Sequence, residues 1–267
     1  MSSHPSLTLG AHVDQTDPIA EAQARGITMV QFFLGDPQSY KGPVVHHEGG
    51  AEGLRAAAQE AGVDLYVHAP YMINVATTNN RIRIPSRKLL QQHMTAATEI
   101  GAKGLIVHGG HVGDDDDPAK GFDNWRKAIE ATDLTIPLLL ENTAGGDNAM
   151  ARHLDRIGRT WEAIQQADGA DMVGFCLDTC HAWAGGIELG EVVEQVRSIT
   201  GRIDLVHANN SRDAAGSGAD RHAPLGDGQI PQDELADVLR AAGAPVLLET
   251  PGADLHEADL AWLRERL

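Results

Sequence analysis

The stretch Val173–His181 reads Val-Gly-Phe-Cys-Leu-Asp-Thr-Cys-His and joins a short β-prone run to two side chains that can bind a metal ion. Apolar residues dominate the run up to Leu177, and Asp178 and His181 follow. Apolar runs of strand length that end in His, Asp or Glu recur along the chain. A fold that gathers the ends of these runs would therefore gather the polar side chains as well.

Eight such runs are predicted as strands, with helix-like segments between them. The strands are expected at Leu7–Val13, Met29–Leu34, Leu65–Pro70, Gly104–His108, Pro137–Asn142, Val173–Asp178, Ile203–Ala208 and Pro245–Thr250. The helices are expected at Ala20–Gly26, Ala51–Ala61, Ser86–Gly101, Pro118–Ala131, Ala151–Gln166, Leu189–Thr200, Pro231–Ala242 and Ala253–Leu267.

Strict alternation of strands and helices predicts a parallel sheet. Eight units in a chain of 267 residues predict one closed (β/α)8 barrel, a TIM barrel, as a single domain over residues 1–267. An open doubly wound sheet is the alternative, but no glycine-rich dinucleotide fingerprint follows the first strand. The longest predicted loop is Val206–Ile230.

Nine potential metal ligands lie at or near the carboxyl ends of strands three to eight, where barrels of this kind place their active sites. They are His68, His108, Glu141, Asp178, His181, His207, Asp220, His222 and Glu249. Imidazole and carboxylate donors without thiolate suit Zn²⁺, Mn²⁺ or Fe²⁺. With Glu141 or Glu249 as bridging carboxylates, the set fits two or three ions, and paired ions are the usual device for phosphoester hydrolysis.

The remaining histidines have weaker signals. His12 and His111 are expected to support the ligands, and His46 and His47 to lie near a substrate. Surface positions are expected for four others: His4, His93, His153 and His256.

The formal net charge is −17, whereas DNA-binding proteins usually carry a basic surface. Bound divalent ions would reverse the local charge around the ligands, so the total does not decide the partner. The acidic run Asp114–Asp117 is interpreted as a solvated loop.

No apolar run approaches the ~18 residues of a membrane span, and the first residues lack a signal-peptide pattern. Cys176 and Cys180 are too far apart on an extended strand for a disulfide. We therefore expect no membrane partner and a cytoplasmic location.

At these residues the chain resembles the endonuclease IV family of apurinic/apyrimidinic endonucleases, a family within the xylose-isomerase-like TIM barrels. Three motifs carry the resemblance: His68–Val75, Gly174–Gly186 and His207–His222. The resemblance implies a monomer with three zinc ions that cleaves double-stranded DNA on the 5′ side of an abasic site. The implied products are a 3′-hydroxyl and a 5′-deoxyribose phosphate, and blocked 3′ ends would also be trimmed.

The resemblance also implies roles for individual residues. His68, His108 and Glu141 would hold the first zinc ion, and Glu141 would bridge to a second, completed by Asp178, His207 and Glu249. The third would bind to His181, Asp220 and His222. Glu141 or Glu249 would orient the attacking hydroxide.

Five further residues are implied to contact DNA. Tyr71 and Met72 match a wedge that enters the duplex while the abasic nucleotide is flipped out. Gln38 stands where the family usually has Arg, and Arg212 where it usually has Lys; Arg221 lies in the third motif. Asn210 stands where an acid is usual.

Two other functions remain open. A sugar isomerase or epimerase of the xylose-isomerase-like superfamily would need only Glu141, Asp178, His207 and Glu249, with one or two ions. A metal- or DNA-binding protein without activity is the other. Neither needs the additional donors, namely His68, His108, His181, Asp220 and His222.

Overall fold

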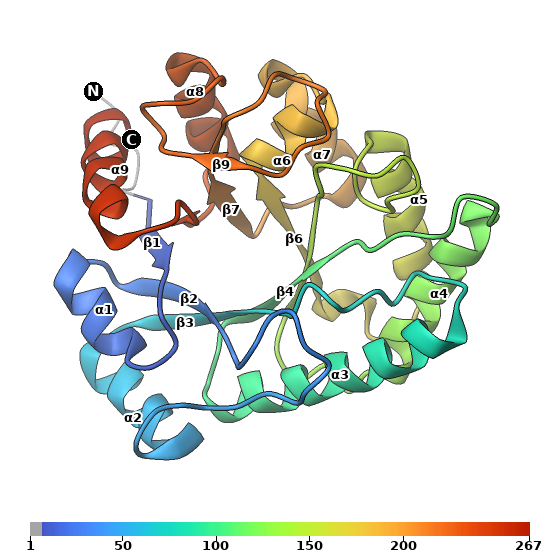
Figure 1. Ribbon diagram of the computed structural model, residues 1–267, viewed down its shortest axis with the longest axis horizontal. Helices are drawn as coiled ribbons and strands as arrows, with labels where there is room; N and C mark the ends of the chain where they lie inside the picture. The colour runs from blue at the N-terminus through green and yellow to red at the C-terminus, as the bar shows by residue number, and fades with distance from the viewer. Residues whose placement is uncertain (1–6) are drawn as a thin grey trace.

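A computed structural model describes residues 7–267, and these residues form a closed parallel barrel surrounded by helices (Figure 1). The barrel strands are β1 (Leu9–His12), β2 (Met29–Phe33), β3 (Asp64–His68), β4 (Gly104–His108), β5 (Leu138–Glu141), β6 (Val173–Asp178), β7 (Leu205–Ala208) and β10 (Val246–Leu248). Each pairs in parallel with its neighbours, and β10 closes the barrel between β7 and β1. The predicted TIM barrel is confirmed; the expectation that residues 1–267 are one domain stays a prediction.

The outer helices alternate with these strands. They are α1 (Pro18–Arg25), α2 (Gly50–Ala61), α3 (Asn80–Glu99), α4 (Pro118–Ala131), α5 (Leu154–Ile164), α7 (Leu189–Thr200), α8 (Gln232–Ala242) and α9 (Ala253–Arg266). Local chemistry sets their ends. The Asp17 side chain accepts a hydrogen bond from Ala20 N at the start of α1, and Gly26 ends that helix at φ 61°.

The interior of the barrel contains one layer of mostly apolar side chains. These are Met29, Tyr66, Ile106, Leu139, Cys176, Leu205 and Leu247. Side chains two positions apart on a strand share a face, so the residue two positions after each of these also points into the barrel. Those residues are Gln31, His68, His108, Glu141, Asp178, His207 and Glu249. Strand periodicity alone therefore places this ring of mostly polar side chains, which we call the polar ring, one layer above the apolar side chains inside the barrel.

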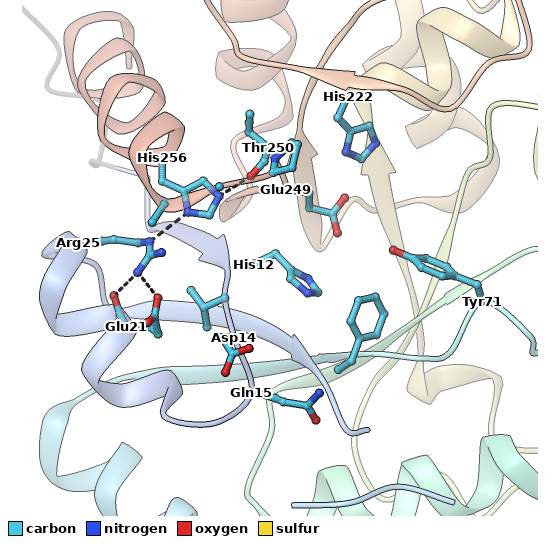
Figure 2. Close-up of a pocket in the computed structure, with 15 residues that line it drawn as sticks. His12, Asp14, Gln15, Glu21, Arg25, Tyr71, His222, Glu249, Thr250 and His256 are labelled. Atoms are coloured by element: carbon cyan, nitrogen blue, oxygen red, sulfur yellow. Dashed lines mark hydrogen bonds and ion pairs between the residues drawn. The ribbon is translucent and has the colours of Figure 1, made fainter. Parts of the chain in front are cut away.

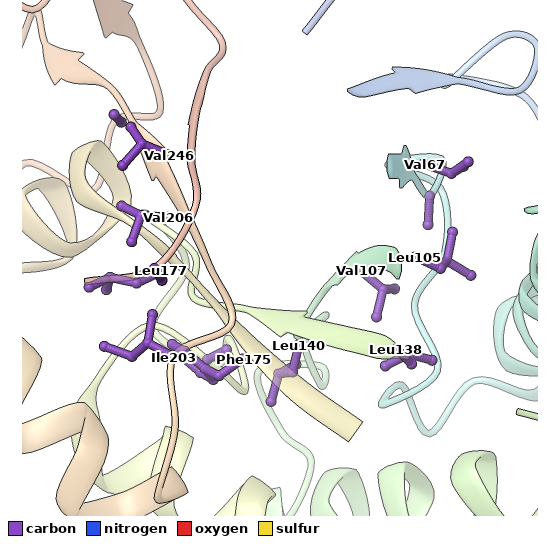
Figure 3. Packing of buried hydrophobic residues seen from close by; sticks show 14 of the residues in the cluster. Val67, Leu105, Val107, Leu138, Leu140, Phe175, Leu177, Ile203, Val206 and Val246 are labelled. Carbon is purple, nitrogen blue, oxygen red and sulfur yellow. The ribbon is translucent and has the colours of Figure 1, made fainter. Parts of the chain in front are cut away.

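The alternate positions of the strands face the helices and form the main core. Figure 3 shows Val67, Leu105, Val107, Leu138 and Leu140 in this layer, and all five are buried. Because the apolar side chains pack on both faces of the strands, the strand ends are held in fixed positions, and the polar ring is held with them.

Two helices differ from the prediction. Helix α3 begins at Asn80 rather than Ser86, because Pro85 lies inside its first turns instead of marking a boundary. A seven-residue helix, α6 (Thr179–Gly185), follows β6 directly, so Cys180 lies in a helix and not on an extended strand. Both Cys176 and Cys180 are free and buried.

The predicted loop Val206–Ile230 contains a small antiparallel pair, β8 (Asn210–Ser211) and β9 (His222–Ala223). Two-residue strands around a turn rich in Gly, Ser and Ala give too little periodicity to be recognised in sequence. A short 3₁₀ helix, η1 (Ala170–Met172), leads into β6.

Two histidines predicted on the surface are buried instead. His93 is a buried residue of α3, and the side chain of His256 lies against Arg25 of α1. His256 accepts from Arg25 Nε at Nδ1 and donates from Nε2 to the Thr250 carbonyl, at 3.0 and 2.7 Å. His153 is exposed, and His4 lies outside the described residues. Among residues 7–267, no helix combines the length and hydropathy that a bilayer crossing requires.

Candidate metal centre

The nine predicted ligands converge at the carboxyl end of the barrel in three groups of donors. The groups are His68 with His108 and Glu141; Glu141 with Asp178, His207 and Glu249; and His181 with Asp220 and His222. Within each group the ligand atoms all lie within 4.8 Å of one another. The structure therefore brings together the same three sets that the family resemblance implies.

Glu141 connects the first two groups through its two oxygens. Its Oε2 lies 3.2 Å from His68 Nε2 and 3.2 Å from His108 Nε2. Its Oε1 lies 2.9 Å from His207 Nδ1, which is also 3.3 Å from Glu249 Oε2. Glu141 is fully buried, and each of its two carboxylate oxygens faces a different donor group, which is the arrangement of a bridging ligand.

The third group aims three donors at one point. Asp220 Oδ1 lies 3.2 Å from both His181 Nε2 and His222 Nε2. Neither nitrogen makes a hydrogen bond to the described residues, although both are buried. Unpaired buried nitrogens are unfavourable unless something else satisfies them. Two imidazoles and a carboxylate fit a tetrahedral zinc site with one open position.

Local structure explains how Asp178 and His181 serve different groups. Asp178 is the last residue of β6 and caps α6, because its Oδ1 accepts a hydrogen bond of 2.6 Å from His181 N. The turn of α6 then carries the His181 ring toward β9, where His222 lies. The Asn210 side chain fixes the segment that follows β9, since its amide hydrogen-bonds to the backbone of Leu225 and Ile230.

Three of the ligand histidines are oriented by an oxygen at their other ring nitrogen. His68 Nδ1 donates to the Ala69 carbonyl at 2.7 Å, His181 Nδ1 to the Asn142 carbonyl at 2.8 Å, and His207 Nε2 to Gln31 Oε1 at 2.8 Å. Such contacts are typical behind metal ligands, because they fix which nitrogen remains for the ion.

Gln31 is a site residue that the sequence analysis missed. Its Nε2 donates to Glu249 Oε1 at 2.6 Å and to His12 Nδ1 at 3.0 Å. A carboxylate cannot donate, so this contact fixes the amide orientation and turns Oε1 toward His207. The available signal was its place two residues after Met29 in an otherwise apolar strand. His12 thus contacts the predicted ligands indirectly, through Gln31. His111 instead accepts hydrogen bonds from the Asn74 side chain.

The carboxylates and imidazoles of the cluster strongly perturb one another's pKa. Burial alone would raise the pKa of Glu141, but the charges of His207 and His108 hold it well below its usual range. Burial is again the largest effect on Glu249, and its pKa still falls to about 2 because of His207. The pKa of His207 rises well above its ordinary value despite burial, since the carboxylates of Glu249 and Glu141 favour its cation. These buried acids require positive charge next to them.

The two cysteines also lie near the donors but remain thiols. Burial raises the pKa of both Cys176 and Cys180 to about 12. A thiol is a weak ligand compared with a thiolate. The donor chemistry is therefore that of nitrogen and oxygen.

A cavity of about 550 Å³ opens above the cluster. Figure 2 shows His12, Tyr71, His222 and Glu249 turned toward this shared space. Tyr71 also lines a second hollow of about 180 Å³ beside His108. Its ring packs 5.3 Å from Phe33 and 5.6 Å from His108, so it stands as a wall between the two hollows.

Comparison with known proteins gives a consistent result. A family described as "Xylose isomerase-like TIM barrel" matches residues 19–266. Proteins named "Probable endonuclease 4" from Mycobacterium bovis and Mycobacterium tuberculosis are 54% identical over 260 residues, which cover 97% of this chain and 99% of theirs. The crystal structure of endonuclease IV from Thermus thermophilus superposes with a TM-score of 0.81 at 26% identity, covering 97% of this chain and 99% of that one.

The chain belongs to the endonuclease IV family. It is therefore an enzyme of the nuclease class. A D-tagatose 3-epimerase-like protein also superposes, with a TM-score of 0.76 over 97% of both chains. At 19% identity that likeness shows the shared barrel alone.

The residues of this chain that are predicted to contact DNA lie around the open, carboxyl end of the barrel. Tyr71 is 53% and Met72 37% exposed, and Gln38 is exposed on the β2–α2 connection. Arg212 donates from Nε to the His222 carbonyl at 2.9 Å, so it braces β9. Arg221 is exposed but forms an ion pair with Asp213, which neutralises part of its charge.

Proposed function

We propose that this protein is a zinc-dependent endonuclease that hydrolyses the phosphodiester on the 5′ side of an abasic site in double-stranded DNA. The proposal includes removal of blocked 3′ ends. The observation that carries it is the set of three adjacent donor groups, two of them sharing Glu141. Three zinc ions are the proposed occupants, and Mn²⁺ or Fe²⁺ would suit the same nitrogen and oxygen donors.

Bound ions of this kind stabilise negative charge on phosphoryl and leaving-group oxygens and make water more acidic. The chain itself positions the acids around them. Glu249 receives hydrogen bonds from Gln31 at Oε1 and from Asn209 Nδ2 at Oε2, at 2.6 and 3.2 Å. Its carboxylate therefore has a fixed orientation, and we assign it, with Glu141, the role of orienting the attacking water and accepting its proton.

Tyr71 and Met72 supply the proposed wedge. Both side chains are large, apolar in part and exposed at the rim of the cavity. Burial is the largest factor that raises the pKa of Tyr71, and Glu249 and Glu141 add to it. Its hydroxyl thus stays protonated at neutral pH and can donate a hydrogen bond to a flipped-out sugar or phosphate.

The isomerase alternative uses only Glu141, Asp178, His207 and Glu249. Those residues form one of the three groups, and the other two would have no task in proton transfer on a sugar. The extra donors favour phosphodiester hydrolysis. We extend the proposal to a monomer acting in the cytoplasm.

The test is cleavage of a 5′-labelled duplex that carries one tetrahydrofuran abasic analogue. This analogue lacks the aldehyde that a lyase needs, so a cut requires hydrolysis. We expect one product, cut on the 5′ side of the lesion, whose 3′-hydroxyl a polymerase extends, and no cut in the undamaged duplex. An uncut lesion duplex together with epimerisation of a ketose by the same preparation would overturn the proposal in favour of the isomerase.

A further inference from the structure

One side of the barrel mouth carries positive charge, although the chain has 38 acids and 21 Lys and Arg residues. The segments 37–47 and 65–98 contain no Asp or Glu. They contain five basic residues: Lys41, Arg81, Arg83, Arg87 and Lys88. We call these five the basic flank.

The two segments lie beside each other in space. Tyr40 Oη donates a hydrogen bond of 2.9 Å to the Met72 carbonyl. Gly42 lies next to the Gln92 side chain, because a Cβ atom built on Gly42 would be 3.6 Å from Gln92 Oε1. Figure 1 shows the β2–α2 connection running alongside α3. Lys41 is therefore next to the helix that carries the other four cations.

The exposed members share one face of α3. Arg81, Ile84, Lys88 and Gln92 follow one another at steps of three or four residues, which aligns them on a helix. Arg81 and Lys88 are exposed, and Ile84 is 64% exposed. This face begins just after the loop that presents Tyr71 and Met72.

None of the five cations makes an ion pair within residues 7–267. Arg83 donates to the carbonyls of Thr77 and Thr78, and Arg87 to that of Asn124. Burial lowers the pKa of Arg87, and the charge of Arg83 lowers it further. Asp123 acts in the opposite direction on Arg87, so an acid lies near this cation although the two form no ion pair.

Acids border the flank on more than one side, since the exposed Asp36 and Glu48 stand at the two ends of segment 37–47 and others lie toward α4. Asp116, in the run Asp114–Asp117, accepts from Thr78 Oγ1 at 2.5 Å, and Asp123 is already paired with Arg126 and Lys127. A polyanion is therefore attracted at Lys41, Arg81 and Lys88 and repelled at the acids around them.

We propose that the basic flank binds the phosphates of duplex DNA beside the lesion, and so supplies the long-range attraction that the rest of this acidic protein lacks. The proposal rests on the DNA substrate of the proposed function. Rows of unpaired Lys and Arg bind phosphates without regard to sequence, and Ile84 offers an apolar contact between them. Lys41 lies three residues from Gln38, so the flank returns a cation to the loop in which Gln38 replaces the usual Arg.

The test compares two variants of the full-length, metal-loaded protein. Lys41→Gln/Arg81→Gln/Lys88→Gln removes three charges from the flank. The control, Lys103→Gln/Arg202→Gln/Arg240→Gln, removes three charges near the amino ends of β4, β7 and β10, on the opposite end of the barrel. Binding of an intact duplex and of a tetrahydrofuran duplex is measured by fluorescence anisotropy over a series of salt concentrations.

We expect the flank variant to bind both duplexes more weakly, on the order of tenfold, with the same factor for each. Its slope of log affinity against log salt should fall by about 2 to 3, since each lost phosphate contact removes about 0.9. The control should keep the wild-type slope and affinity. Equal losses of affinity in both variants, or a loss of affinity for the lesion duplex alone, would overturn the proposed role of the basic flank. A wild-type protein that neither binds nor cuts DNA would instead overturn the proposed function.

Discussion

Replacing Gln31 with Leu gives the most informative perturbation of the centre, because it changes no proposed ligand. Gln31 is fully buried and makes three hydrogen bonds, to Glu249, His12 and His207. Leu fills similar space but can neither donate nor accept. The substitution therefore removes the support behind two ligands and leaves the ligands themselves in place.

The size of the effect follows from the groups left without partners. His207 Nε2–H and Glu249 Oε1 each lose a hydrogen bond, and an unsatisfied buried group costs about 1–3 kcal/mol. Loss of a contact behind a metal ligand typically weakens metal binding by about 10–100-fold. We expect a loss of zinc affinity in that range and a lower melting temperature.

The assay is competition for zinc between the protein and a chromophoric chelator at neutral pH. Nitrogen-15 NMR of the histidine rings reports in parallel whether His207 keeps its Nε2–H tautomer. Met29→Leu, two residues earlier on the same face of β2, is the control and should bind zinc like the wild type. Wild-type zinc affinity and an unchanged His207 tautomer in Gln31→Leu would refute the positioning argument.

Three further outcomes are expected. Glu141→Gln should lower the single-turnover cleavage rate on the order of 10³-fold or more, because loss of the shared carboxylate removes several kcal/mol of transition-state stabilisation. Circular dichroism should show that the variant is folded, and full activity would exclude the bridging role. Tyr71→Ala should weaken binding of abasic duplex more than it slows removal of a 3′-phosphate from a short substrate, and equal effects would reject the wedge. Burial lowers the pKa of His93 to about 4 from 6.5, so the unfolded chain takes up a proton first and stability falls between about pH 6.5 and 4. Denaturant unfolding of His93→Leu should lose up to about 3 kcal/mol less than the wild type over that interval, and identical pH profiles would contradict this.

The sequence was sufficient for the barrel and for the convergence of the donors that stand at the ends of barrel strands, because both depend on strand periodicity. An apolar residue such as Leu139 fixes which face of β5 points inward, and Glu141 follows two positions later on the same face. The ends of parallel strands must then meet. His68, His108 and His207 obey the same rule, so the structure brings them to Glu141 as expected.

The sequence was insufficient where position depends on contacts between distant segments. Gln31 looks like one polar residue in a strand, and its role arises only when β7 and β10 bring His207 and Glu249 to it. His256 was expected on the surface, but Arg25 from α1 and the Thr250 carbonyl enclose it. Pairing of β8 with β9 likewise joins residues separated by a long turn.

The net charge of −17 left the partner undecided, and the distribution of charge in space is compatible with the proposed DNA partner. Acids outnumber Lys and Arg by 38 to 21, whereas Arg81 and Lys88 are exposed on α3 and form no ion pair with the described residues. An acidic protein can approach DNA in one orientation if its cations are gathered on one side of its active site. The basic flank offers such an orientation.

The central claim is that nine side chains hold a cluster of three divalent ions. Elemental analysis of the purified, dialysed protein, with cleavage of the abasic duplex measured on the same sample, tests it most directly. We predict close to three zinc-type ions per chain, with cleavage activity falling as chelation removes them. Full cleavage by a preparation with less than one such ion per chain would contradict the account.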